Sequence, residues 1–120
     1  MILKHMLNYA AGLDRAFHAL ADPTRRAIVE RLTREPTSVS ALAKPLAMSL
    51  PAVMQHLAVL EASGLVRSEK SGRVRMCRVE PEALSRVERW INDRRTEWEN
   101  RLDRLADYLS TQTDQGESHE

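Results

Sequence analysis

Two short apolar patterns separated by a tight connection constrain the fold of this chain most strongly. Apolar residues recur at the spacing of one helix face over residues 39–46 and again after Ser49. The first set is Val39, Leu42, Ala43 and Leu46, and the second is Val53, Leu57 and Leu60. Ser49 can cap a helix, and Pro51 falls in the first turn, where its missing N–H is harmless. Because only Ala47 and Met48 remain for the connection, the pattern predicts two helices joined by a tight turn.

Further helices and a hairpin surround this pair. Leu13, Phe17 and Leu20 form a helical stripe that ends before Asp22. Asp22 and Pro23 are typical of a second helix start, with Ile28, Val29 and Leu32 facing inward. Residues 35–38 form a breaker cluster, and Gly64 is expected to end the helix that follows Ser49. Residues 65–79 alternate around Ser71-Gly72 and predict a two-stranded hairpin.

The C-terminal region predicts one long helix over residues 81–110. Its apolar residues lie within roughly 40° of one line on a helical wheel. They are Leu84, Val87, Ile91, Trp98, Leu102, Leu105 and Leu109. At ~1.5 Å per residue the helix spans about 45 Å, longer than a small domain is wide, so a second chain is expected to cover part of the stripe. Arg94 and Arg95 interrupt the stripe. Their guanidiniums are expected to pair with acids of either chain, such as Asp93, Glu97 or Glu99. Residues 111–120 are polar and are expected to fray.

The order of elements predicts a mainly α fold with a small β-hairpin, a winged helix-turn-helix with a long C-terminal dimerisation helix. We expect a single domain over residues 1–120, with a DNA-binding core at 13–80 and the dimerisation helix at 81–110. In this arrangement the helix after the tight turn can enter a DNA major groove, and the hairpin flanks it as a wing.

The charge distribution supports a nucleic-acid partner. The whole chain has a formal charge of only +1. Residues 1–78 hold 12 Lys and Arg against 6 Asp and Glu, whereas residues 79–120 hold 6 against 11. Fifteen of the 18 basic residues are Arg, whose planar fork suits phosphates and guanine edges. A basic front half favours a nucleic-acid surface, with a solvated charged face as the alternative.

The start of the helix after the turn carries the candidate base-reading residues. Gln55 points outward and can bond adenine N6 and N7, while Pro51, Ala52 and Met54 can pack against thymine methyls. The alternative for Gln55 is a solvated surface amide. His56 lies at the boundary of this face, where it packs or touches phosphate. The candidate DNA-binding residues of the helix are Ser49, Leu50, Pro51, Ala52, Met54, Gln55 and His56.

The hairpin carries a dense basic patch. Lys70, Arg73 and Arg75 surround its turn, Arg67 and Arg78 lie lower on the strands, and only Glu69 opposes them. Cationic side chains on a projecting ribbon suit phosphate or minor-groove contact. We predict DNA contact for Lys70, Arg73 and Arg75, foremost for Arg73. The alternative is a solubilising hairpin, which is favoured for Arg67.

Several segments together resemble the ArsR-type winged-helix regulators over residues 13–109. They are Leu20–Arg26, Met48–Val53 with His56-Leu57 and Leu60-Glu61, and Gly64–Val66. The wing Gly72–Arg75 and the tail with Trp98-Glu99 and Arg101–Leu105 resemble the metal-independent branch of that family. The resemblance implies a homodimer built from the first and last helices, and DNA binding that an effector relieves. It adds Leu13 and Phe17 to the predicted interface. The family carries polar residues where Leu50, Pro51 and Ala52 stand here.

The residue inventory argues against metal sensing and catalysis. The sequence lacks the cysteine cluster and the Asp and His pairs that the metal sensors of the family use, so no cofactor or metal is expected. Phosphate-binding glycine loops and hydrolase motifs are also missing, so an enzyme is not expected. The single cysteine, Cys77, cannot form an internal disulfide, and it is either a buried small hydrophobe or a redox sensor. Without an apolar leader or membrane span, a cytoplasmic location is expected.

These features predict a homodimeric transcriptional regulator that binds double-stranded DNA, acts as a repressor on a palindromic operator, and responds to a small-molecule or redox effector. The alternative is a winged-helix module that binds a protein partner and does not recognise DNA sequence. The basic wing favours DNA as the partner. The apolar start of the helix after Ser49, here called the reading helix, keeps the protein-binding alternative open.

Overall fold

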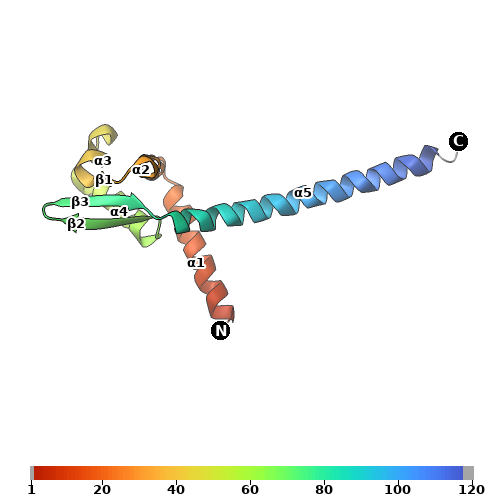
Figure 1. The fold of residues 1–120 in the computed structure, drawn as a ribbon, viewed down its shortest axis with the longest axis horizontal. Coiled ribbons are helices and arrows are strands. Elements are labelled where there is room, and N and C mark those ends of the chain that lie inside the picture. Colours follow the sequence, from red (N-terminus) through yellow and green to blue (C-terminus); the bar gives the residue numbers. More distant parts are fainter. Residues whose placement is uncertain (1, 118–120) are drawn as a thin grey trace. The chain divides into compact units, whose positions relative to one another are not determined.

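The computed structural model describes residues 2–117, and for residues 2, 4–8 and 114–117 it describes the backbone alone. Its helices are α1 (Ile2–Leu20), α2 (Pro23–Arg34), α3 (Val39–Leu46), α4 (Leu50–Ala62) and α5 (Pro81–Glu117). Its strands are β1 (Thr37–Ser38), β2 (Val66–Ser71) and β3 (Val74–Val79) (Figure 1). This arrangement confirms the predicted winged helix-turn-helix. By internal contacts the chain divides into two units, residues 1–87 and residues 88–120.

Local capping fixes the helix boundaries that the sequence predicted. Asp22 caps α2 by accepting a hydrogen bond from the N–H of Arg25 at 3.0 Å, and Ser49 caps α4 from the N–H of Ala52 at 3.3 Å. Gly64 follows α4 at a φ of 80°. The N–H of Gly64 bonds the carbonyl of Glu61 and the N–H of Leu65 bonds the carbonyl of Leu60, which is the Schellman arrangement. The predicted stop at Gly64 is therefore confirmed.

The turn between α3 and α4 depends on one residue. Ala47 ends α3 in the left-handed region with a φ of 52°, and among residues 2–117 no other non-glycine residue has a positive φ. A left-handed residue reverses the chain direction in very few residues. The turn therefore brings α4 against α3 at the short spacing that the sequence predicted.

The sheet corrects one prediction. The breaker cluster at residues 35–38 contains β1, which pairs antiparallel with β3 through Thr37 to Cys77 and Ser38 to Met76. The predicted two-stranded ribbon is thus a three-stranded sheet in the order β1-β3-β2. The short strand forms because Thr37 is buried and its backbone hydrogen bonds must be satisfied, while Ser38 caps α3 immediately afterwards. β1 anchors the wing to the helical part of residues 1–87.

The core of residues 1–87 combines side chains from every helix and from the sheet. Its fully buried members include Ile28, Leu42, Val53, Leu60, Leu65 and Cys77. Val53, Leu57 and Leu60 hold the inner face of α4 in this core, as predicted. Among residues 2–117, none of the helices carries an apolar stretch long enough to span a lipid bilayer.

Two helix ends differ from the sequence prediction. α1 begins at Ile2, well before the apolar stripe that starts at Leu13. α5 continues to Glu117 rather than ending at Ser110, so the helix is seven residues longer than predicted at this end. The hydroxyls of Thr111 and Thr113 bond the carbonyls four residues earlier, and no proline interrupts this stretch. Residues 118–120 lie outside the described part of the chain.

Candidate nucleic-acid interface

The outer face of α4 presents most of the predicted base-reading residues. Ser49, Leu50, Pro51, Met54 and Gln55 are exposed, whereas Ala52 and His56 are partly buried. The exposure follows from the helical spacing, since the opposite face of α4 is held in the core. Gln55 is thus available to a base edge, as the sequence predicted.

His56 lies in a polar cluster with α2. Its Nδ1 is 3.4 Å from a guanidinium nitrogen of Arg25 and 3.9 Å from Oδ2 of Asp22. Arg25 also donates to the carbonyl of Ala19 at 2.8 Å and to that of His18 at 3.2 Å. These contacts turn the His56 ring toward the protein. Of the two sequence alternatives for His56, packing is the one that the structure displays.

Asp22 is the acidic member of this cluster. The hydrogen bond from the backbone N–H of Arg25 holds the pKa of its carboxyl below the ordinary value. Partial desolvation raises this pKa, and the charge of Arg25 lowers it. A carboxyl with a lowered folded pKa stabilises the fold above its unfolded pKa of about 3.9, and this contribution is lost as the pH falls through the folded pKa. Asp22 therefore contributes stability at neutral pH that acid removes.

We expect Asp22→Asn to lower the melting temperature at pH 7, because the amide keeps the cap acceptor but loses the charge. The difference from the unsubstituted protein should shrink as the pH falls below ~4, because the unfolded chain then binds a proton that the native carboxyl, with its lowered pKa, does not yet bind. Thermal unfolding from pH 7 to pH 3 measures this effect. Asp14→Asn, which removes an exposed carboxylate from α1, is the matched control. A difference that stays constant down to pH 3 would contradict the assignment.

The wing ends in a two-residue turn that projects one arginine. Ser71 pairs with Val74, so Gly72 and Arg73 occupy the two central positions. Gly72 has a φ of 63°, which a type II′ turn requires at its first central residue. Lys70 and Arg73 are exposed, and within the described residues neither has a hydrogen-bond or ion-pair partner. Both cationic heads are therefore free to meet phosphate.

The other basic residues of the wing have partners within the chain. Arg75 donates to the hydroxyl of Ser68 at 2.9 Å, and that hydroxyl donates to the carboxylate of Glu61 at the end of α4. Arg67 lies 3.6 Å from Glu80, and Arg78 lies 3.4 Å from Glu69. Sequence reasoning missed the link from Arg75 through Ser68 to Glu61, because its members come from three separate elements. The link connects the wing to α4, the reading helix.

A hollow of about 330 Å³ lies between the wing and the two helices of the helix-turn-helix. It is lined by Ser38, Val39 and Ser40 from β1 and α3, by Leu50 and Met54 from α4, and by Arg73, Val74 and Arg75 from the wing. The start of α4 and the tip of the wing thus border one surface. Four of the ten predicted DNA-binding residues line this hollow, namely Leu50, Met54, Arg73 and Arg75.

The predicted interface residues fall into two groups. Leu13 and Val87 are each 8% exposed and belong to the core, and Leu84 packs against that core, so these three have little surface for a second chain. Phe17 is more than a third exposed on α1. Along residues 88–117, Ile91, Trp98, Leu102, Leu105 and Leu109 are all exposed. The exposed part of the predicted interface therefore lies mainly on the C-terminal unit.

The two arginines that interrupt this apolar stripe form ion pairs, as predicted. Arg94 lies 3.2 Å from Glu97, and Arg95 lies 3.8 Å from Glu99 on the next turn. Arg94 also lies over the Trp90 ring, 5.2 Å from its centroid. The predicted pairing of both guanidiniums with neighbouring acids is confirmed within one chain.

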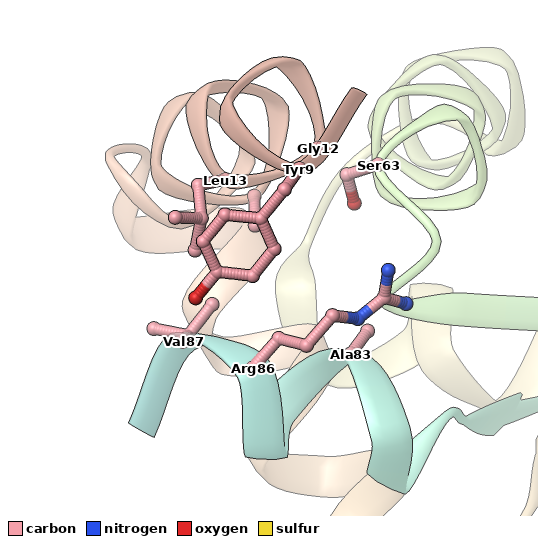
Figure 2. A pocket seen from close by; sticks show the side chains of 8 residues that line it. Tyr9, Gly12, Leu13, Ser63, Ala83, Arg86 and Val87 are labelled. Carbon is pink, nitrogen blue, oxygen red and sulfur yellow. The ribbon is translucent and has the colours of Figure 1, made fainter. Parts of the chain in front are cut away.

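A small cavity separates α1 from the first turns of α5. Figure 2 shows the Tyr9 ring beside Val87 on one side and the Arg86 side chain reaching toward Ser63 on the other. Its volume is about 30 Å³, far below the ~300 Å³ at which ligand pockets begin. The cavity has room for water rather than for a metabolite.

Cys77 is fully buried in the sheet. Burial raises the pKa of its thiol, the nearby Glu61 carboxylate raises it further, and Arg75 acts in the opposite direction. A buried thiol with a raised pKa is a poor nucleophile. Within the described residues, no group of three or more His, Cys, Asp and Glu side chains could hold a metal ion.

Comparison with known proteins agrees with this geometry. A family described as a helix-turn-helix domain matches residues 20–69. The HTH-type transcriptional regulator Rv2034 of Mycobacterium tuberculosis is 50% identical over 72 residues, which cover 60% of this chain and 67% of that protein. The HTH-type transcriptional repressor SmtB of the same species is 39% identical over 84 residues, 70% of this chain and 60% of that protein.

Solved structures extend the match beyond the helix-turn-helix. The crystal structure of the ArsR family transcriptional regulator RHA00566 is 49% identical with a TM-score of 0.71, covering 75% of this chain and 93% of that one. This chain belongs to the ArsR family of transcriptional regulators. An ArsR-like transcriptional regulator from Rhodococcus sp. RHA1 is 38% identical with a TM-score of 0.70, over 80% of this chain and 91% of that one.

Membership in the ArsR family decides the class of function. The chain is a DNA-binding transcriptional regulator and not an enzyme, because the family acts by recognition through its helix-turn-helix. The resemblance drawn from the segments between Leu20 and Leu105 is thereby confirmed at the level of the family.

Proposed function

We propose that this ArsR-family protein is a homodimeric repressor that occupies a palindromic operator in the cytoplasm. The arrangement of Gln55 and Arg73 carries the proposal. Gln55 is exposed on the outer face of the capped helix α4, and Arg73, which has no partner among the described residues, stands at the tip of the adjacent wing. A helix face of this kind reads base edges in the major groove, while cations on a ribbon neutralise phosphate. Residues 13–80 form the DNA-binding core in this proposal, and residues 81–110 form the dimerisation helix.

The Gln55→Ala variant tests base reading. We expect it to lose ~1 to 3 kcal/mol of binding free energy on the operator and to relax the preference at one symmetric pair of positions. The slope of log affinity against log salt should stay nearly unchanged, because no phosphate contact is removed. Operators selected from random DNA with the purified protein, followed by titration at several salt concentrations, provide both measurements.

Arg73→Ala is the counterpart on the wing. It should weaken binding to all sequences about equally and reduce the salt slope by about 1 for each lost phosphate contact. Both variants are expected to fold normally, since both side chains are exposed. If Gln55→Ala keeps its affinity and selectivity for the operator, specificity must come from the first turn of α4, from Met54 or from DNA shape.

The regulator belongs, in this proposal, to the metal-independent part of the family. His18 and His56 lie on different helices, and His56 is engaged with Asp22 and Arg25. Stoichiometric zinc, cadmium or arsenite should leave operator affinity unchanged, because tight sites need several convergent ligands at ~2.0 to 2.3 Å. Calorimetry and DNA titration check this expectation. Tight stoichiometric metal binding accompanied by release of the operator would contradict it.

The burial of Cys77 favours a small-molecule effector over a redox effector. Cys77→Ser should keep its affinity for DNA, since the side chain lies in the core and away from the reading face. An oxidant that releases the unsubstituted protein from its operator, but not this variant, would instead establish a redox role for Cys77.

A further inference from the structure

Three exposed apolar side chains border the hollow between α4 and the wing. Leu50 is 49% exposed, Met54 is 41% exposed and Val74 is 48% exposed. Leu50 and Met54 lie one turn apart on the same face of α4, and Val74 is the first residue after the hairpin turn. None of the three belongs to the core cluster. Apolar surface gathered at one exposed place marks a contact site.

The surroundings of this patch limit what can cover it. Arg73 and Arg75 line the same hollow, and the guanidinium of Arg73 has no partner within the described residues. An occupant must therefore be apolar at one point and anionic beside it. In DNA the C5-methyl group of thymine projects into the major groove between two phosphate backbones, and this combination satisfies both requirements.

We infer that Leu50, Met54 and Val74 receive the C5-methyl group of a thymine, so that the operator carries thymine at one symmetric pair of positions. The inference rests on the proposed function and names what the site reads. Gln55, the residue after Met54, can bond adenine in a neighbouring pair through N6 and N7. The apolar first turn and the amide together then select A·T pairs.

Thymine-to-deoxyuridine substitution tests the inference, because it removes the methyl group and leaves the pairing edge unchanged. An operator is first selected from random DNA with the full chain, and each thymine is then replaced singly and in symmetric pairs. Uracil should weaken binding about 4-fold for each methyl lost at the predicted positions, the equivalent of ~0.8 kcal/mol per buried carbon. Both half-sites together should lose about 15-fold by the same reasoning.

Protein variants assign this effect to the hollow. Leu50→Ala and Met54→Ala should bind the thymine and uracil operators nearly equally, whereas Leu50→Met should keep the difference. Met76→Ala is the matched control, because Met76 is an exposed methionine of the wing that does not line the hollow. Circular dichroism and sedimentation show whether each variant keeps its fold and its oligomeric state.

The outcomes distinguish failure of the proposed function from failure of the thymine inference. If no DNA sequence is enriched, the proposed function fails and the inference fails with it. If an operator is enriched but uracil is tolerated at every position, the inference alone fails. It also fails if Leu50→Ala and Met54→Ala keep the full preference for thymine, or if these variants change the oligomeric state, which would mean that a second copy of the chain covers the hollow.

Discussion

Replacing Leu102 and Leu105 with aspartate should convert the proposed dimer to a monomer. Both side chains are about half exposed on the C-terminal unit and continue the stripe that includes Trp98 and Leu109. Two charges in an apolar interface have no partners there. Burying one unpaired charge in the interface costs about 3 kcal/mol of association free energy. A monomer contacts a single half-site, so operator affinity should fall on the order of 100-fold.

The matched control places the same two charges on the opposite face of the helix. Thr96→Asp combined with Asn100→Asp alters α5 about 150° and 170° away from the centre of the stripe and should leave the proposed dimer intact. Sedimentation equilibrium at micromolar concentration distinguishes the two double variants. An unsubstituted protein that sediments as a monomer under these conditions would refute the dimer proposal.

Leu60→Ala should produce the largest loss of stability among changes on the reading helix. Leu60 is 0% exposed and lies on the inner face of α4, where its carbonyl also accepts the bond that closes the helix end. Truncation of a fully buried leucine leaves a cavity and typically lowers the free energy of unfolding by about 2–5 kcal/mol. DNA binding should then be lost at temperatures where the variant unfolds and retained where it stays folded.

Urea denaturation followed by circular dichroism measures this loss, at one fixed protein concentration because the proposed dimerisation would contribute to apparent stability. Gln55→Ala, on the outer face of the same helix, should show no comparable loss. A decrease of less than about 1 kcal/mol for Leu60→Ala would mean that the core around α4 closes over the cavity. The pair of variants separates damage to the fold from damage to base reading.

Local chemistry explains why much of the fold could be predicted. The caps at Asp22 and Ser49, the stop at Gly64 and the inner face of α4 each depend on a few neighbouring residues, so the sequence pattern was sufficient. The strand at Thr37–Ser38 was missed because two residues carry no periodicity, and its partner β3 lies almost forty residues later. Tertiary pairing, rather than local propensity, makes it a strand.

The candidate site was predictable in its exposure but not in its internal contacts. The spacing of apolar residues along α4 was enough to place Gln55 on the outer face. It could not show that His56 turns toward Arg25, or that Arg75 is held through Ser68 by Glu61. These contacts join elements that only folding brings together. Two of the side chains with a predicted DNA contact thereby also serve the protein's own structure.

The contacts of Arg25 join the end of α1 to α4. This one side chain bonds two carbonyls at the end of α1 and also lies against His56 in the middle of α4. A shift of α1 relative to α4 would break these bonds or carry the reading helix along. One side chain of α2 therefore couples the position of the end of α1 to that of the reading helix.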